Sequence, residues 1–112
     1  MPAPIDLTAL SLMLGGDASL VQMILEKFRA EIESDISALA DLANGSDAEA
    51  IRALAHRLKG TCSNAQAMPL SNVAKALQTA TSGGDVSHAP DLIEKLEMER
   101  QLLEKYLAEQ GY

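Results

Sequence analysis

The residues best placed to do chemistry lie close together on one predicted helix, where Lys59, Gly60 and Ser63 follow His56. Because an α-helix turns once every 3.6 residues, spacings of three, four and seven put these residues on one face. On an ideal helix His56 points about 140° away from the centre of the apolar stripe, toward solvent. This face therefore offers a partner an imidazole, an ammonium, an empty side-chain position and a hydroxyl.

The chemistry that suits this face is phosphoryl transfer to histidine. A neutral imidazole is a competent nucleophile near neutral pH, because its ordinary pKa is about 6.5. Lys59 would bring positive charge to the phosphoryl oxygens, and Gly60 would leave room for a partner. Glycine inside a helix costs about 1 kcal/mol relative to alanine, which favours a functional reason for Gly60. A solitary exposed histidine often has no function, so the residues alone leave both interpretations open.

The segment around His56 resembles a known signature. Residues 55–67 read AHRLKGTCSNAQA and are followed by Leu70 and Ser71. This run is similar to the pattern of the histidine-containing phosphotransfer (HPt) domain family: His-x-Leu-Lys-Gly, small residues, Gly-Ala, then Leu. The resemblance extends over nearly the whole chain. One departure is Gln66, which stands where the family usually has the glycine that allows close helix approach, so we expect an extended helix or a repacked corner there.

The resemblance implies a role for each of four residues. His56 would carry the phosphoryl group through Nε2, Lys59 would stabilise that group, and Gly60 would give clearance for a receiver domain. Gln78, on the next helix, would hydrogen-bond the imidazole and so select its tautomer. The chain would be a phosphoryl carrier without an ATP site of its own, not an enzyme in the usual sense.

The resemblance also implies the partners. A histidine kinase or the aspartate of a response-regulator receiver domain would supply phosphate, and a second receiver would accept it, with Mg²⁺ expected only in the receiver. The alternative is a helical adaptor that binds a kinase or receiver without carrying phosphate. The kinase, the receivers, the direction of flow and the pathway output are not specified by the sequence.

The apolar pattern predicts helices that position these residues. Leucine, isoleucine, valine and alanine recur every three or four residues through most of the chain, and aromatic residues make up only 3%. We therefore expect one all-α domain over residues 1–112, an antiparallel four-helix bundle with a short additional N-terminal helix capping one end. The methionines would fill gaps in the aliphatic core. The short first helix is expected over about residues 5–14 and the third helix over about 47–65, and the apolar stripes of the other helices run over 20–43, 70–77 and 92–107.

Local signals mark the expected helix ends. Asp17 is a candidate N-cap for the second helix. Ser46 and Glu49 form a candidate capping box, in which the Ser46 hydroxyl accepts from the Glu49 amide. Pro69 and Pro90 suit the first turns of the last two helices.

Composition and charge argue against several classes of partner and location. The net charge of −7 argues against nucleic acid and against an anionic membrane surface. No apolar run approaches the roughly 20 residues that span a bilayer, and the N-terminus lacks the basic region of a signal peptide. The single cysteine, Cys62, suits a cytoplasmic, reducing setting and a buried position. No metal site is expected from Cys62 or His88, no cofactor is implied, and a monomer is expected.

Overall fold

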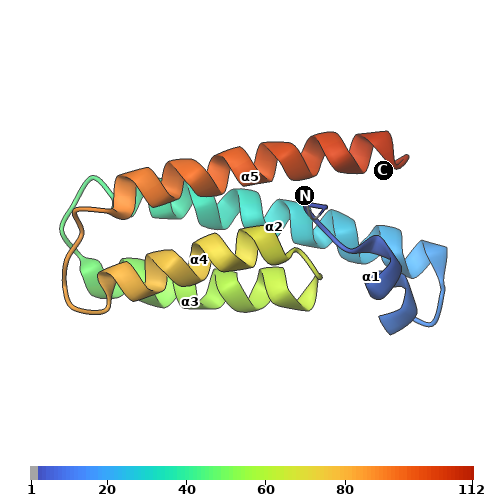
Figure 1. Cartoon of the computed structure of the whole chain (residues 1–112), viewed down its shortest axis with the longest axis horizontal. Coiled ribbons are helices and arrows are strands. Elements are labelled where there is room, and N and C mark those ends of the chain that lie inside the picture. Colours follow the sequence, from blue (N-terminus) through green and yellow to red (C-terminus); the bar gives the residue numbers. More distant parts are fainter. Residues whose placement is uncertain (1–2) are drawn as a thin grey trace.

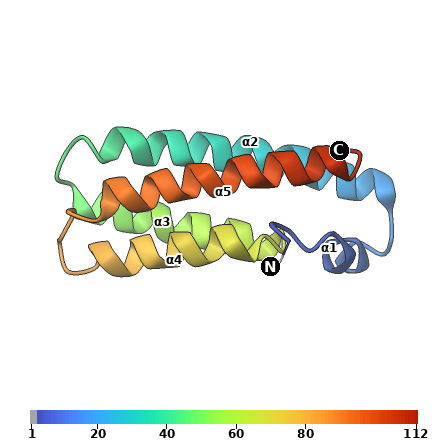
Figure 2. The ribbon, with the colours of Figure 1, turned by 45° about the horizontal axis from the view of Figure 1, so that its top comes forward.

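The computed structural model describes residues 3–112, and those residues form α-helices and no strand. The four long helices lie side by side and alternate in direction, while the short first helix sits at one end of the bundle (Figures 1 and 2). The predicted all-α bundle with a short N-terminal helix is therefore confirmed. The helices are α1 (Leu7–Met13), α2 (Ala18–Leu42), α3 (Ala48–Asn64), α4 (Met68–Thr81) and α5 (Ala89–Glu109).

An aliphatic core runs along the bundle axis. Each long helix contributes side chains from its predicted stripe, and Phe28 is the one aromatic residue among them. Burying a leucine or isoleucine side chain stabilises a fold by about 1.5–3 kcal/mol, so these stripes decide which face of each helix turns inward. The large side chains buried most completely include Leu25, Ile32, Leu39, Ile51, Leu58, Leu77, Leu96, Leu103 and Leu107.

The methionines do not fill that core, which corrects the prediction made for them. Met13, Met23, Met68 and Met98 are between 46% and 62% exposed. The physical reason is that leucine, isoleucine and alanine already close the space between the helices, so no irregular gap is left for a flexible side chain. Met1 lies outside the described residues.

The corner between α1 and α2 is built from turn residues. Gly15 and Gly16 have φ values of 69° and 76°, which glycine adopts without steric cost. The predicted N-cap is confirmed, because the Asp17 side chain accepts a hydrogen bond of 3.2 Å from the amide of Leu20. In the described part of the chain no single helix has the length and hydropathy to cross a membrane; only α1 and α2 taken together do, and they are bent by 115°.

The start of α3 differs from the predicted capping box. Asp47, not Ser46, is the N-cap, and its carboxylate accepts a hydrogen bond of 3.0 Å from the amide of Ala50. The helix consequently begins one residue later, and Glu49 turns to Arg52, with which it forms an ion pair of 2.6 Å. An aspartate beside a serine offers a charged acceptor to the free amides at the helix start, which explains the shift.

Gln66 forms the corner between α3 and α4, and its conformation explains why glycine is usual there. Helix α3 ends at Asn64, and Gln66 has a φ of 67°, the left-handed region that favours glycine. The Gln66 amide donates to the carbonyl of Ser63 (3.0 Å) and the Ala67 amide to that of Cys62 (2.9 Å). This pair of bonds is the Schellman helix ending. Helix α3 is therefore not extended past this corner. Position 66 requires a left-handed backbone conformation, which glycine adopts more easily than glutamine.

Replacing Gln66 by glycine is expected to stabilise the fold by about 0.5–1 kcal/mol, because it removes the strain of a left-handed glutamine at some cost in unfolded-chain entropy. Thermal unfolding should show a rise of about 2–6 °C for a chain of this size. Gln66→Ala is the matched control, since it removes the same side chain and keeps the strain. An equal gain from the alanine variant would contradict the explanation.

Candidate functional site

His56 lies on the exposed surface of α3, as the helical spacing predicts. Its neighbours Ala55 and Leu58 are completely buried and hold this stretch of α3 against the core. The imidazole is thus carried by a rigid helix while its edge stays open to a partner. A nucleophile in this position needs no pocket of its own, because a docking protein can enclose it.

Hydrogen bonds of two serine hydroxyls fix how far α4 is shifted along α3. The Oγ atoms of Ser63 and Ser71 are 2.9 Å apart, and the Ser71 hydroxyl also donates to the backbone carbonyl of Lys59 at 3.1 Å. Ser71 is buried, so these bonds lie between the two helices. They fix which residues of α3 and α4 face each other.

Gln78 stands level with His56 as a consequence of that pairing. His56 lies seven residues before Ser63 on α3, and Gln78 lies seven residues after Ser71 on α4. Because the helices are antiparallel, both steps cover the same two turns in the same direction. No hydrogen bond joins Gln78 to His56 in the described structure. The Gln78 Oε1 atom is nevertheless buried and, within residues 3–112, has no donor.

Lys59 is half-buried one turn after His56. No ion pair to its ammonium is found within residues 3–112, where the acidic side chains that form ion pairs do so with arginines. Its charge is therefore available to a group bound at His56. Ser63, which the spacing placed on the same face, instead directs its hydroxyl to Ser71.

Gly60 is surrounded by open space on its outer side. A Cβ atom built at Gly60 would meet no heavy atom within 4 Å beyond its own helix backbone. The packing of this chain therefore does not require glycine at this position. Since alanine would favour the helix by about 1 kcal/mol, the absence of a side chain one turn from His56 points to a requirement outside the chain.

An ion pair beside His56 was not anticipated from the sequence. Asp35 on α2 is only 4% exposed, and its Oδ1 accepts a hydrogen bond of 2.6 Å from Arg57, the residue after His56. Its second oxygen, Oδ2, is buried without a partner in the described structure. The available signal was that Asp35 continues the apolar stripe of α2 three residues after Ile32, a position where a charge calls for a partner.

Cys62 and His88 are not part of this site. Cys62 is completely buried, and burial together with the nearby charge of Asp35 raises the pKa of its thiol to about 12. A thiol of that pKa is a poor nucleophile at neutral pH, and the predicted buried position is confirmed. His88 lies at the start of α5, exposed. Within residues 3–112 no three His, Cys, Asp or Glu side chains gather as a metal site would need.

Two comparisons with known proteins match this chain. The sequence model of the Hpt domain matches residues 23–109, which include all of α3, α4 and α5. The chain is also similar to the crystal structure of histidine-containing phosphotransfer protein B from Pseudomonas aeruginosa PAO1. The TM-score is 0.87 and the identity 27%, over 100% of this chain and 99% of that chain. No curated protein sequence matches significantly.

Proposed function

The chain belongs to the Hpt domain family and is a histidine phosphotransfer protein of phosphorelay signalling, and we propose that His56 carries its phosphoryl group. The observation that carries this proposal is that three features lie together on α3. An exposed imidazole stands one turn from an ammonium that has no ion-pair partner among residues 3–112, and one turn from open space at Gly60.

The transfer needs only the imidazole as a reacting group. The lone pair of His56 Nε2 attacks the phosphorus of an aspartyl phosphate in line with the bond to the aspartate oxygen. The nitrogen–phosphorus bond forms while the phosphorus–oxygen bond breaks, and its electron pair returns to the aspartate carboxylate. Nδ1 keeps its proton throughout. Return of the phosphoryl group to a second aspartate reverses the same steps.

Lys59 stabilises the charge on the transferred group. Its ammonium is one helical turn from His56, on a flexible stem long enough to approach the equatorial phosphoryl oxygens. Charge brought to these oxygens favours the transition state of phosphoryl transfer. Lys59 is thus the chain's own contribution of positive charge, while Mg²⁺ belongs to the receiver.

Gln78 orients the imidazole. Its Oε1 is a buried acceptor with no donor in the described residues, and His56 stands level with it on the neighbouring helix. A hydrogen bond from Nδ1–H to this oxygen would satisfy the acceptor and leave the Nε2 lone pair directed outward.

Replacing Gln78 by leucine is expected to slow phosphorylation of His56 by about tenfold, the effect of losing one hydrogen bond of roughly 1.4 kcal/mol. Nitrogen NMR of the ring should show His56 mainly protonated at Nδ1 in the wild type and a more even mixture of tautomers in the variant. Asn72→Leu, the same kind of change at an exposed position of α4 six residues before Gln78, is the control. An unchanged tautomer ratio in Gln78→Leu would contradict this role.

The receiver docks over His56 and toward α1. Beyond Gly60, Thr61 and Asn64 line a hollow of about 480 Å³ between α1, α2 and α3, with Phe28 among its apolar walls. Leu12 and Met13 of α1 are exposed beside this end of the bundle. Apolar centres of this kind are common in protein interfaces.

Two leucines of α1, Leu10 and Leu14, also line this hollow, but the inner face of α1 packs against the core. Leu10 is 1% exposed, and Leu7 and Leu14 pack half-buried against the core, so they close the end of the bundle. The helical period had placed these leucines on one face of α1 without showing which way that face turns. The structure turns it inward and leaves Leu12 and Met13 outside.

The remaining expectations complete the proposal. We propose that residues 1–112 act as one domain, that the protein works as a cytoplasmic monomer, and that it binds neither nucleic acid nor membranes. It takes phosphate from a histidine kinase or a receiver and has no ATP site of its own. The net charge of −7 supports the exclusion of nucleic acid as a partner.

Phosphate transfer in vitro tests this function. The purified chain is incubated with a panel of phosphorylated receivers and autophosphorylated kinases, and binding to each is measured in parallel. We expect acid-labile, base-stable phosphate on the chain with at least one donor. Measurable binding without label from any donor would instead support a helical adaptor that does not carry phosphate.

A further inference from the structure

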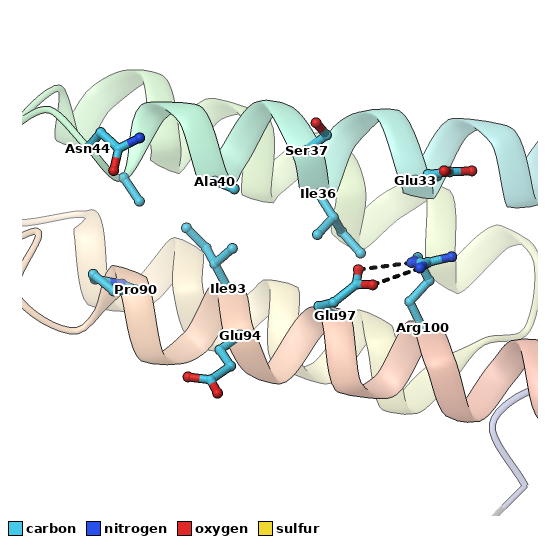
Figure 3. A pocket seen from close by; sticks show the side chains of 11 residues that line it. Glu33, Ile36, Ser37, Ala40, Asn44, Pro90, Ile93, Glu94, Glu97 and Arg100 are labelled. Atoms are coloured by element: carbon cyan, nitrogen blue, oxygen red, sulfur yellow. Dashed lines mark hydrogen bonds and ion pairs between the residues drawn. The ribbon is translucent and has the colours of Figure 1, made fainter.

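A second surface feature lies between α2 and α5, away from His56. It is a groove of about 580 Å³, a size at which proteins commonly hold apolar side chains or small ligands. Figure 3 shows Ile36 and Ile93 pointing from their two helices into the space between α2 and α5, with Asn44 and Pro90 at one end. No residue of α3 or α4 lines this groove, so phosphotransfer at His56 does not use it.

The groove is open because α2 presents small side chains to α5. Ser37, Ala40 and Ala43 follow each other at three-residue intervals along this edge of α2, and none is long enough to reach across. Ile36 and Ile93, which are 5% and 6% exposed, form the floor. The result is an apolar trough that runs along the helix axes, the shape in which an amphipathic helix lays its apolar face.

The rim of the groove is acidic. Glu33 on α2 and Glu94 on α5 are exposed, and within residues 3–112 neither carboxylate forms an ion pair. The one basic lining residue, Arg100, is already bound to Glu97 by an ion pair of 2.6 Å, drawn in Figure 3. Three carboxylates thus stand against a single guanidinium that is already engaged, and the edge attracts positive charge.

We propose that this groove binds an amphipathic helix of a partner protein, one that carries lysine or arginine on both sides of a leucine-rich stripe. The stripe would cover Ile36 and Ile93, and the basic residues would meet Glu33 and Glu94. A second copy of this chain is a poor occupant, because its own charge of −7 would repel the acidic rim. Helices α2 and α5 lie on the side of the bundle opposite α3 and α4, so a partner held here leaves His56 free for a receiver (Figure 2).

A defined peptide tests the proposal. The probe is an 18-residue helical peptide of leucine and lysine with leucines at helical spacing, and its counterpart has glutamate in place of every lysine. Amide NMR spectra of the ¹⁵N-labelled protein should shift along 36–44 and 90–97 with the lysine peptide, and the affinity should fall as salt is raised. The glutamate peptide should not bind. Shifts centred on α1 and α3 instead would overturn the proposal.

Variants of the protein distinguish binding of the peptide in the groove from a general attraction of a basic peptide to an acidic protein. Glu94→Lys should weaken binding by about fivefold or more, whereas Glu109→Lys, the same charge change at an exposed site of α5 outside the groove, should change it by less than about twofold. Ala40→Gln fills the trough with a polar chain at constant charge and should weaken binding by about tenfold. Equal losses from both lysine variants, or unchanged binding to Ala40→Gln, would overturn the proposal.

Discussion

Replacing His56 by glutamine is expected to remove all transferable phosphate from this protein. An amide nitrogen has no basic lone pair to attack phosphorus, so label should fall by at least about a hundredfold, to background. The fold should be unaffected, since His56 is exposed on α3 and surface substitutions change stability by about 0.5 kcal/mol or less. Labelling from a phosphorylated receiver, with circular dichroism and thermal unfolding alongside, measures both.

His88→Gln is the matched control, because it removes the other histidine at an exposed position and should leave the label unchanged. Binding of His56→Gln to the same receiver should persist within a few fold, since the docking surface is intact. Acid-labile label that survives in His56→Gln would show that another residue carries the phosphoryl group. Loss of label in both variants would point to an effect on the fold or on docking.

Replacing Gly60 by leucine is expected to raise stability and lower phosphotransfer at once. The site has open space for a side chain, and leucine favours a helix interior over glycine by about 0.8 kcal/mol, so unfolding should require about 0.5–1 kcal/mol more. The same side chain would stand one turn from His56, where a receiver must approach closely. In-line transfer tolerates little displacement, so the rate should fall by about a hundredfold.

Urea unfolding and single-turnover transfer from a phosphorylated receiver measure these opposite effects. Ala108→Leu is the control, because it adds a leucine to an exposed position of α5, far along the chain from His56, and should leave transfer unchanged. Gly60→Ala should give the same gain in stability with a smaller loss of rate. Normal transfer by Gly60→Leu would contradict the view that this glycine provides clearance for a partner.

Much of the site could be predicted because helix geometry is local. Once residues 48–64 are recognised as helical, the direction of His56 follows from 100° of rotation per residue, and the buried faces of Ala55 and Leu58 follow with it. The family resemblance of residues 55–67 then suggested the chemistry. None of this depends on which helix lies next to α3.

The features that were missed all depend on contacts between segments or on competition between neighbouring groups. Ser46 and Asp47 are both good N-cap residues, and only the folded structure shows that Asp47 is the N-cap of α3. Gln66 reads as an ordinary helix former, yet its φ of 67° is imposed by the turn into α4. The methionines suit a core in general, but this core was already filled by leucine, isoleucine and alanine.

By itself the sequence determined the helices, their buried faces and the outward direction of His56, because each of these follows from the periodicity of a single segment. Only the tertiary structure decided which helices adjoin. That arrangement brings Gln78 level with His56 through the Ser63–Ser71 contact and pairs Asp35 with Arg57. It also leaves the α2–α5 groove open. Such relations join residues that are distant in the chain, and they are settled by how whole side-chain surfaces pack.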